Sequence, residues 1–460
     1  MAFGLFKRNV AADTIIMGGK IYTQDLNLPW AEAVACKDGK IIAVGDYEAL
    51  KDFEGRNTEF IYLENGIMLP GYIDTCGHPV MNAFADSCLY LKPGNLEYTL
   101  AQISEYASQK RESRIIFAYG YNENILNDME PKETRECLDK ISNDKPIVIL
   151  GMSGLHCWFN TFALEVVKAA AIEDEIDTVS LQYLLSVLEP IDFDTMPERV
   201  PYDMQKYSKR GFTSVFDCGA PEFFASIYQN MMISLFHEKM IKQRFYGSLL
   251  INRDADPRMV IHKLKQYKTN CIELDGLINF NTLKLIVDRT QDQNFLSSTF
   301  LKDICMEAGD KGFNVHVDAI GKKAVFETID AMESVISAGY KKSSFTIAHD
   351  ETLTPEELIN TSFRQEIKES PGTIYKSDID WLCIQNVNSI EMAIDILTID
   401  GAIQLGIDND YGSIEKGKRA DFAVFNDNPF DLENLSDFKD LQAVMTIIEG
   451  KIVYNALESE

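Results

Sequence analysis

Residues 69–79 read LPGYIDTCGHP, and the rest of the chain is interpreted around this stretch. An apolar run leads through Pro-Gly into a Tyr-Ile pair, which is typical of a short buried strand. Successive side chains of a strand alternate between its faces, so Asp74, Cys76 and His78 are predicted to point the same way. A carboxylate, a thiol and an imidazole together can bind a metal. The alternative is a strand-to-loop transition that carries a Cys and a His by chance.

The chain carries a large excess of acidic residues. It has 44 Lys and Arg against 71 Asp and Glu, a formal net charge of −27, and an isoelectric point near 4.6. Such a surface repels phosphates, which argues against nucleic acid and anionic membranes as partners. The fractions of hydrophobic residues (46%) and charged residues (25%) are ordinary for a globular protein.

The nine cysteines are scattered along the chain, odd in number, and include no Cys-x-x-Cys pair. This pattern favours reduced, intracellular thiols over a disulfide framework. The first residues, MAFGLFKRN, lack an apolar core of signal-peptide length. No apolar run approaches the roughly 20 residues of a membrane-spanning helix. We therefore expect a cytoplasmic protein.

Both ends of the chain are predicted to form β-structure. Within residues 13–68, the segment 31–45 reads AEAVACKDGKIIAVG and places two short apolar strands around Asp-Gly, a strong hairpin signal. Residues 412–425 (GSIEKGKRADFAVF) and 444–454 (VMTIIEGKIVY) add further strands at the other end.

Between the two ends, helical and strand patterns alternate. An amphipathic helix is predicted over 96–111, and Gly211 is predicted to cap a helix before a strand. The predicted strands cover residues 114–120, 146–150, 212–217, 245–250, 283–288, 313–318 and 344–349. This α/β alternation has the lengths and spacing of parallel strands in a (β/α)8 barrel.

The stretch at 69–79 resembles the first barrel strand of the amidohydrolase superfamily, which normally reads Pro-Gly-Phe-x-Asp-x-His-x-His and supplies two metal-binding histidines. Here Cys76 stands where the first histidine belongs, and His78 matches the second. Residues 412–421 match the family pattern Gly-Ser-Ile-x-x-Gly-Lys-x-Ala-Asp at every fixed position.

Within that superfamily, the chain is similar to the YtcJ-like branch, also called amidohydrolase family 3. Residues 144–164, 211–217 and 316–324 carry this resemblance. It implies a TIM-like (β/α)8 barrel over 69–403, with an insert at about 80–160 and a final strand that is shortened or deleted. It also implies a small β-sandwich domain built from 1–68 and 404–460.

The resemblance implies a divalent metal, zinc in one or two ions, at the strand ends. The implied ligands are Cys76, His78, a carbamylated Lys284, Asp318 and His349. Asp318 stands where the family has a histidine, and both cysteine and aspartate are themselves metal ligands. The alternative for Lys284 is a plain strand lysine whose head reaches solvent.

The last ligand of the family lies in a Gly-Ser-Asp tripeptide on the eighth strand and acts as general base. The segment from His349 to Gly412 is shorter than the family's, and its similar tripeptide is Lys-Ser-Asp, ending at Asp378. Either Asp378 is the catalytic base on a trimmed final strand, or that strand and its aspartate are deleted.

Further histidines and an aromatic insert complete the candidate residues. His156, Trp158 and Asn160 match the family insert that closes over the pocket, so a contact with substrate is predicted. His316 lies two residues before Asp318. It is predicted either to act as a metal ligand or to be a histidine of the barrel interior that contacts substrate, and we favour the interior position. The remaining histidines lie in helical stretches and are predicted to be on the surface: His237 and His262.

The resemblance implies a hydrolase that acts on C–N bonds of a small molecule through a metal-activated water. The alternative is an inactive protein of this fold that binds a small molecule or a protein partner. It is favoured by the altered histidine pair and by Lys322, where the family has Asp. Nucleophilic chemistry by Cys76 with His78 is a weaker third interpretation. We expect a small-molecule substrate and a homodimer, with neither nucleic acid nor membrane bound.

Overall fold

A computed structural model describes residues 10–85, 88–151, 157–170, 187–188, 196–219, 225–251, 253–274, 276–290, 296–340, 344–348, 367–369, 387 and 389–456. The chain divides into two compact units. The first contains Met1–His78, Asp203–Ala220 and Met232–Glu460, and the second contains Pro79–Tyr202 and Pro221–Met231. Within the described residues, no helix is both long and apolar enough to cross a membrane.

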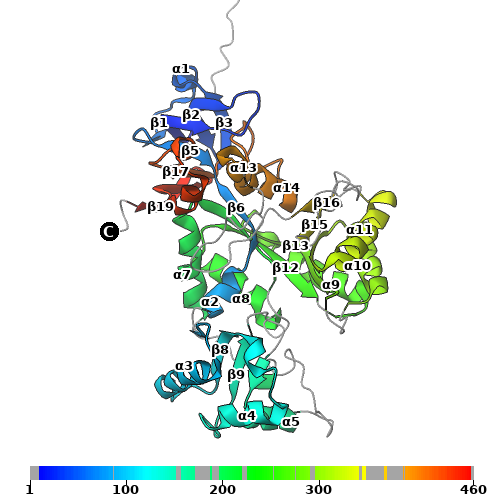
Figure 1. Cartoon of the computed structure of the whole chain (residues 1–460). Helices are drawn as coiled ribbons and strands as arrows, with labels where there is room; N and C mark the ends of the chain where they lie inside the picture. Colours follow the sequence, from blue (N-terminus) through cyan, green and yellow to red (C-terminus); the bar gives the residue numbers. More distant parts are fainter. Residues whose placement is uncertain are drawn as a thin grey trace, which may run out of the picture. The chain divides into compact units, whose positions relative to one another are not determined.

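One sheet of the first unit is built from both ends of the chain (Figure 1). Its eight strands are β1 Thr14–Tyr22, β2 Trp30–Lys37, β3 Lys40–Gly45, β4 Glu59–Tyr62, β5 Ile67–Pro70, β17 Phe422–Phe425, β18 Met445–Ile448 and β19 Lys451–Asn455. β17 pairs antiparallel with β5, so that Phe422 lies opposite Pro70 and Phe425 opposite Ile67. The predicted strands at both ends are therefore confirmed, whereas the sandwich form of this domain stays a prediction.

The hairpin predicted between β2 and β3 is present. Asp38 and Gly39 form its turn with φ angles of 50° and 74°. Two successive left-handed residues are typical of the tight turn that matches the twist of the flanking strands. Buried apolar side chains, including Ile16, Val34 and Phe422, fill the core between these strands.

In the described part of the chain, the second sheet of this unit contains seven parallel strands. In spatial order they are β6 Tyr72–Gly77, β11 Phe212–Asp217, β12 Arg244–Ile251, β13 Ile278–Asp288, β14 Asn314–Ile320, β15 Phe345–Ala348 and β16 Ile367–Glu369. The sheet curls as part of a TIM-like barrel, which confirms the predicted α/β fold. The trimmed final strand predicted before Asp378 lies outside the described residues.

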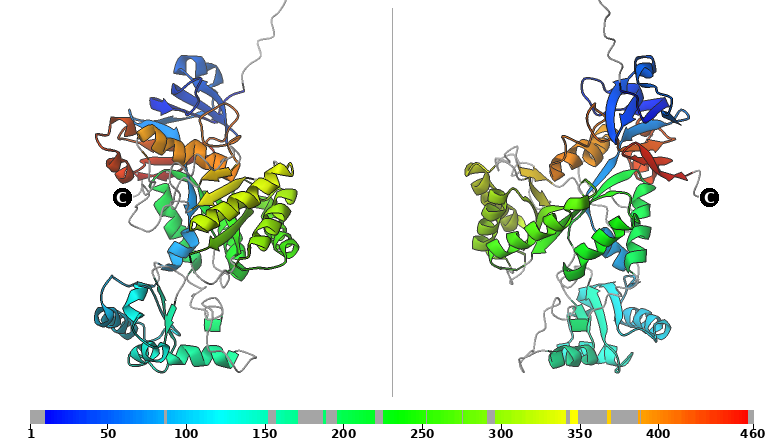
Figure 2. Two further views of the ribbon diagram at one scale, coloured as in Figure 1. Left: turned by 45° about the vertical axis from the view of Figure 1, so that its right-hand side comes forward. Right: turned by 180° about the vertical axis from the view of Figure 1, so that it is seen from behind.

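Helices cover one face of this sheet, and Figure 2 shows α9, α10 and α11 along it. They cover Pro257–Asn270, Ser298–Lys311 and Lys322–Ser337. Leu283 and Leu285 of β13 and Val315 and Val317 of β14 are buried on the helical side, in one apolar core. Because side chains alternate along a strand, Lys284 and His316 face the other way, toward the interior of the curled sheet.

The second unit has its own small sheet, with β7 Leu89–Tyr90, β8 Ile116–Tyr121, β9 Ile147–Gly151 and β10 Cys157–Phe159. The barrel strands predicted at 114–120 and 146–150 are β8 and β9, so their assignment to the barrel is wrong. The reason is their pairing: β9 bonds to β8 on one side and, antiparallel, to β10 on the other. The helices of this unit are α2 Pro79–Ala85, α3 Leu96–Gln109, α4 Pro131–Asp139 and α5 Thr161–Ala170, with a 3₁₀ turn at Glu123–Leu126.

The boundary between the two units falls inside two helices, α7 Met196–Ser208 and α8 Ala225–His237. The remaining helical segments of the first unit are α1 Tyr47–Leu50, α13 Ile390–Asp395, a π-helical turn Ile396–Asp400 and α14 Gly401–Leu405, with 3₁₀ turns at Lys51–Phe53, Ile272–Leu274, Pro429–Asp431 and Leu435–Asp440.

The end of α14 ties separated strands of the parallel sheet together. The side chain of Gln404 donates a hydrogen bond to the backbone oxygen of Thr75 on β6 (2.9 Å). The backbone oxygens of Gln404 and Leu405 accept hydrogen bonds from Ser344, just before β15, and from Asn314 at the start of β14. α14 therefore links the first strand of the sheet to its fifth and sixth strands.

A buried arginine joins the parallel sheet to the terminal sheet. Arg244 is 1% exposed and its Nε and Nη2 donate to the two carboxylate oxygens of Asp421, at 2.8 and 3.2 Å. Nη2 also reaches Glu449 (3.3 Å), and Nη1 donates to the backbone oxygen of Gly276. Burial opposes the charged form, yet the neighbouring Asp421 raises the pKa of Arg244 overall. Asp421 is the last residue of the motif at 412–421, so this motif contributes to the contact between the parallel sheet and the terminal sheet.

Candidate functional site

A lysine and an aspartate meet on neighbouring strands of the parallel sheet. Lys284 lies in the C-terminal half of β13, Asp318 lies in that of β14, and the register places Lys284 beside His316. Lys284 Nζ lies 2.5 Å from Asp318 Oδ1, a hydrogen-bonded ion pair. The lysine side chain is 2% exposed and the aspartate side chain 15%. The head of Lys284 is therefore buried, contrary to the alternative in which it reaches solvent.

His316 lies in the interior of the curled sheet, as the favoured interpretation predicted. It is 2% exposed, and its ring lies 5.4 Å from that of Phe216 on β11. Its Nε2 lies 3.7 Å from Asp318 Oδ1, and among the described residues this nitrogen has no hydrogen-bond partner. Lys284, His316 and Asp318 thus form one group, which we call the strand-end group.

Asp74 lies in the middle of β6, and its carboxylate does not join the strand-end group. The pairing of β6 with β11 is irregular between Asp74 and Gly77, so simple alternation does not hold there. A Cβ on Gly77 would lie 2.3 Å from Asp74 Oδ2, which shows the carboxylate folded over the Gly77 backbone. This irregularity interrupts the regular alternation on which the shared face of Asp74, Cys76 and His78 was predicted, and because the side chain of Cys76 is not described, that shared face stays a prediction.

Tyr207 and Asp217 accompany Asp74, and the sequence patterns assigned neither a role. Burial, and then the carboxylates of Asp74, Asp203 and Asp217, raise the pKa of Tyr207 well above its ordinary value. Asp217 is fully buried and its Oδ1 accepts from the backbone N–H of Gly219 (3.0 Å). In the sequence, the feature that could have indicated Asp217 is its position as the last residue, and the only charged one, of the strand FTSVFD.

The other predicted ligands are described in part. His78 directly follows β6 and is half-buried. Cys76 lies within β6, but the structure does not describe its side chain. The residues His156, His349 and Asp378 lie outside the described ranges. Within the described part of the chain, no group of three or more His, Cys, Asp or Glu side chains could hold a metal ion.

The donor types nevertheless fit a divalent ion such as zinc. His316 Nε2 is a buried nitrogen without a hydrogen bond among the described residues, and Asp318 offers a carboxylate close to it. Imidazole nitrogen and carboxylate oxygen are both common zinc ligands. Lys284 stands against this, because an ammonium beside Asp318 competes with a metal for the same carboxylate.

Trp158 and Asn160 have internal partners in the second unit. Trp158 is 2% exposed, donates from Nε1 to the backbone oxygen of Thr134 (2.7 Å), and packs against Tyr121. The Asn160 side chain accepts from two backbone N–H groups and donates to two backbone oxygens. These contacts give both residues a structural role, and their predicted contact with substrate stays untested.

Comparison with known families adds an independent line of evidence. A family model described as "Amidohydrolase family" matches residues 59–387 and 363–454, most of the chain. The exoenzymes regulatory protein AepA of Pectobacterium carotovorum is 24% identical over 396 residues, covering 77% of this chain and 84% of that protein. The N-substituted formamide deformylase of Arthrobacter pascens is 19% identical over 540 residues, covering 96% and 98%.

Solved structures share the fold. An uncharacterized metal-dependent hydrolase from Pyrococcus furiosus superimposes with a TM-score of 0.62 at 17% sequence identity, covering 91% of this chain and all of that one. At this identity the likeness concerns the fold, and it agrees with the curled parallel sheet described above.

Proposed function

The chain belongs to the amidohydrolase family, and from this premise we propose that it is a hydrolase that cleaves a carbon–nitrogen bond of a small molecule. The observation that carries the proposal is the strand-end group. Lys284 and Asp318 lie in the C-terminal halves of adjacent parallel strands, and enzymes with parallel barrels collect their chemistry at that end.

The residues that would hold a divalent ion, zinc by the nature of the donors, are Cys76, His78, Asp318, His349 and Lys284, the last only as a carbamate, because its ammonium form pairs with Asp318. Such an ion, when bound, lowers the pKa of water and polarises the scissile carbonyl. His316 Nε2 lies 3.7 Å from Asp318 Oδ1 and would add a neutral nitrogen donor beside that carboxylate. Asp378 accepts the proton of the attacking water and returns it to the leaving nitrogen.

The deformylase relative suggests the first substrates to test: a panel of N-substituted formamides, assayed by the release of amine. We expect turnover by the wild-type chain and by Asp330→Asn, a matched control because Asp330 is an exposed carboxylate on α11. Asp318→Asn should lose activity while keeping its thermal unfolding midpoint within a few degrees. Equal turnover by Asp318→Asn and Asp330→Asn would remove the strand-end group from the mechanism.

A second readout does not depend on activity. A Cys76 that ligates metal must be a thiolate, so bound metal should shield it from alkylation and a chelator should expose it. Cys88, which is half-buried, serves as the chelator-independent control. Cys305, whose pKa burial raises to about 12, should stay unlabelled at pH 8 in both samples. Labelling is read by mass spectrometry, beside the metal content of protein purified without chelator.

A second candidate function is a binding protein without catalysis. The observation that favours it is the contact between Lys284 and Asp318, because a fixed ammonium occupies the place a metal would need beside this carboxylate. One relative, AepA, is named as a regulatory protein rather than an enzyme. Labelling of Cys76 that ignores chelator, with substoichiometric metal and no turnover, would select this function.

The domain boundaries are also a proposal. Residues 1–68 and 404–460 would form the composite β-sandwich domain, and 69–403 the barrel with its insert at about 80–160. Pairing of β5 with β17 supports this division. Limited proteolysis should not release a soluble 1–68 fragment that leaves the rest folded. A cytoplasmic location and a homodimer remain predictions.

A further inference from the structure

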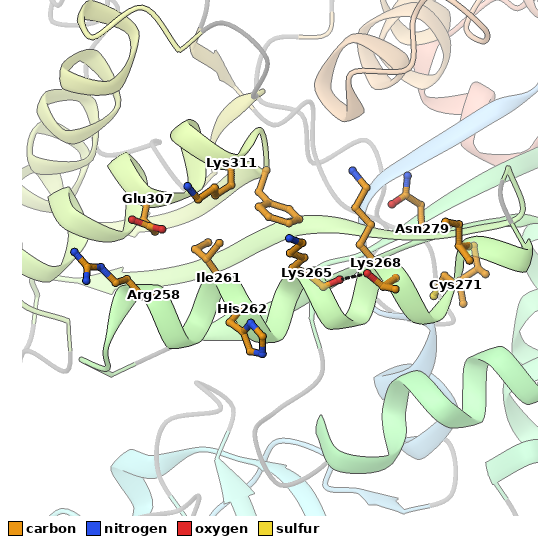
Figure 3. Close-up of a pocket in the computed structure, with 13 residues that line it drawn as sticks. Arg258, Ile261, His262, Lys265, Lys268, Cys271, Asn279, Glu307 and Lys311 are labelled. Atoms are coloured by element: carbon orange, nitrogen blue, oxygen red, sulfur yellow. Dashed lines mark hydrogen bonds between the residues drawn. The ribbon is translucent and has the colours of Figure 1, made fainter.

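A groove of about 650 Å³ lies on the helical side of the parallel sheet, away from the strand-end group. Its walls come from α9, the end of α10 and the first residues of β13, all within the first compact unit (Figure 3). Lys284 and His316 face the opposite side of the same sheet, so this groove is a separate feature.

Positive charge gathers in this groove, although the whole chain carries a net charge of −27. The lining includes the cationic side chains of Arg258, Lys265, Lys268 and Lys311, with His262 beside them. Glu307 is the carboxylate among the lining residues. A local excess of cations over a low-dielectric wall concentrates anions even on an acidic protein.

The floor of the groove is apolar. Ile261, Cys271, Ile278 and Phe313 line it, each 2–4% exposed. Only 4% of Phe313 is exposed, and Lys268 Nζ lies 5.7 Å from the centroid of its ring. Figure 3 shows Lys265 and Lys268 rising from α9 on the side that faces α10. The groove thus combines cations with an apolar floor.

Helix chemistry explains part of this charge. Lys268 and Lys311 lie in the last turns of α9 and α10, where cations are favoured, and Lys311 also pairs with Asp310 (2.5 Å). Arg258 and Lys265 are not explained in this way. Both are exposed, and among the described residues neither has an ion-pair partner.

We propose that this groove binds a small organic anion with a flat apolar body, such as an aromatic phosphate or carboxylate. The anionic group would lie among Arg258, Lys265 and Lys311, and the apolar body would rest against the apolar lining, where Ile272 is 72% exposed. Desolvation of this apolar lining provides affinity that an inorganic anion lacks.

The test is isothermal titration calorimetry on the full chain with three probes: 1-naphthyl phosphate, inorganic phosphate and 1-naphthol. Only the first carries both the charge and the flat body, so it should bind tightest, and added salt should weaken it. Lys265→Glu should weaken 1-naphthyl phosphate about tenfold, because it replaces an attractive charge by a repulsive one.

Lys323→Glu is the matched control, since Lys323 is an exposed helical lysine on α11, outside the groove, with a side chain 71% exposed. It should leave the affinity unchanged. Lys265→Ala, with a smaller loss, guards against a folding defect in the charge reversal. The proposal is overturned if 1-naphthyl phosphate does not bind, if Lys265→Glu and Lys323→Glu have the same affinity, or if either partial probe binds as tightly.

Discussion

Two buried ion pairs of the first unit look alike in composition and differ in their surroundings. Arg244 and Asp421 are held between two sheets by a fork of hydrogen bonds, and Asp421 also accepts from the backbone N–H of Glu449 (2.9 Å). Lys284 and Asp318 meet through one 2.5 Å contact beside a histidine nitrogen that has no hydrogen bond among the described residues. The side chains of the two aspartates are 4% and 15% exposed.

The pair Arg244–Asp421 has a structural role, whereas the pair Lys284–Asp318 is suited to binding. The junction pair is enclosed by fixed polar groups, so neither partner can change its ligand without disturbing two sheets. The strand-end pair keeps an accessible carboxylate and a neighbouring imidazole, which is what a site that binds a substrate or an ion needs. The two pairs should therefore respond differently to substitution.

Loss of Arg244 should have the largest effect. Arg244→Ala leaves Asp421 buried without its counterion, and we expect the free energy of unfolding to fall by about 3–5 kcal/mol. Denaturant titration followed by circular dichroism measures it. Arg244→Lys is the matched control, with a smaller loss, because lysine keeps the charge but not the planar fork. A loss below about 1 kcal/mol for Arg244→Ala would contradict the structural role of this pair.

Loss of Lys284 should cost less stability. Lys284→Met keeps the side-chain length, and Asp318 retains contact with water, so we expect a loss of about 1–3 kcal/mol in the same titration. Lys323→Met on the exposed face of α11 should change the value by less than about 0.5 kcal/mol. If Lys284→Met is as damaging as Arg244→Ala, the two pairs do not differ as described.

Removal of both partners should sharpen the contrast. Lys284→Met with Asp318→Leu replaces the ion pair by apolar groups, and stability should return to within about 1 kcal/mol of wild type. The equivalent change at the junction, Arg244→Met with Asp421→Leu, should not recover, because the backbone N–H of Glu449 loses its acceptor. Equal recovery at both sites in the unfolding titration would refute this distinction.

The smallest effect on stability is expected at Asp378. Asp378→Asn should shift the free energy of unfolding by less than about 0.5 kcal/mol and abolish hydrolysis, since the attacking water needs a proton acceptor. Rates with the formamide panel measure the second effect. Unchanged hydrolysis would place the base elsewhere.

Much of the fold was readable from sequence because local patterns carry it. The turn at Asp38 and Gly39, the strands at both ends of the chain and six strands of the parallel sheet were predicted, although β13 begins at Ile278, five residues before its predicted start. β8 and β9 were assigned to the wrong sheet, because an apolar run of five or six residues does not encode its pairing partner. Their observed pairing, β8 with β7 and β9, and β9 with β10, shows where those strands belong.

The sequence predicted which residues belong to the candidate site, but it did not predict the contacts between them. The resemblance selected Lys284 and Asp318, and the structure brings them together. Their direct ion pair depends on the register between β13 and β14, which no local pattern specifies. The irregular pairing of β6 next to Asp74 is hidden for the same reason, since the sequence there reads as a simple alternating strand.

The pairing of β5 with β17 also orders events during synthesis. When Ile67–Pro70 leave the ribosome, their partner Phe422–Phe425 has not been made, because Phe422 comes 352 positions after Pro70 (422 − 70). At about 5–20 residues per second, that edge waits on the order of 20–70 seconds for its partner. An exposed strand edge can pair with the same edge of another nascent chain. Truncated chains that end before residue 422 should therefore aggregate, and a folding helper that covers this edge would matter most while the barrel is being translated.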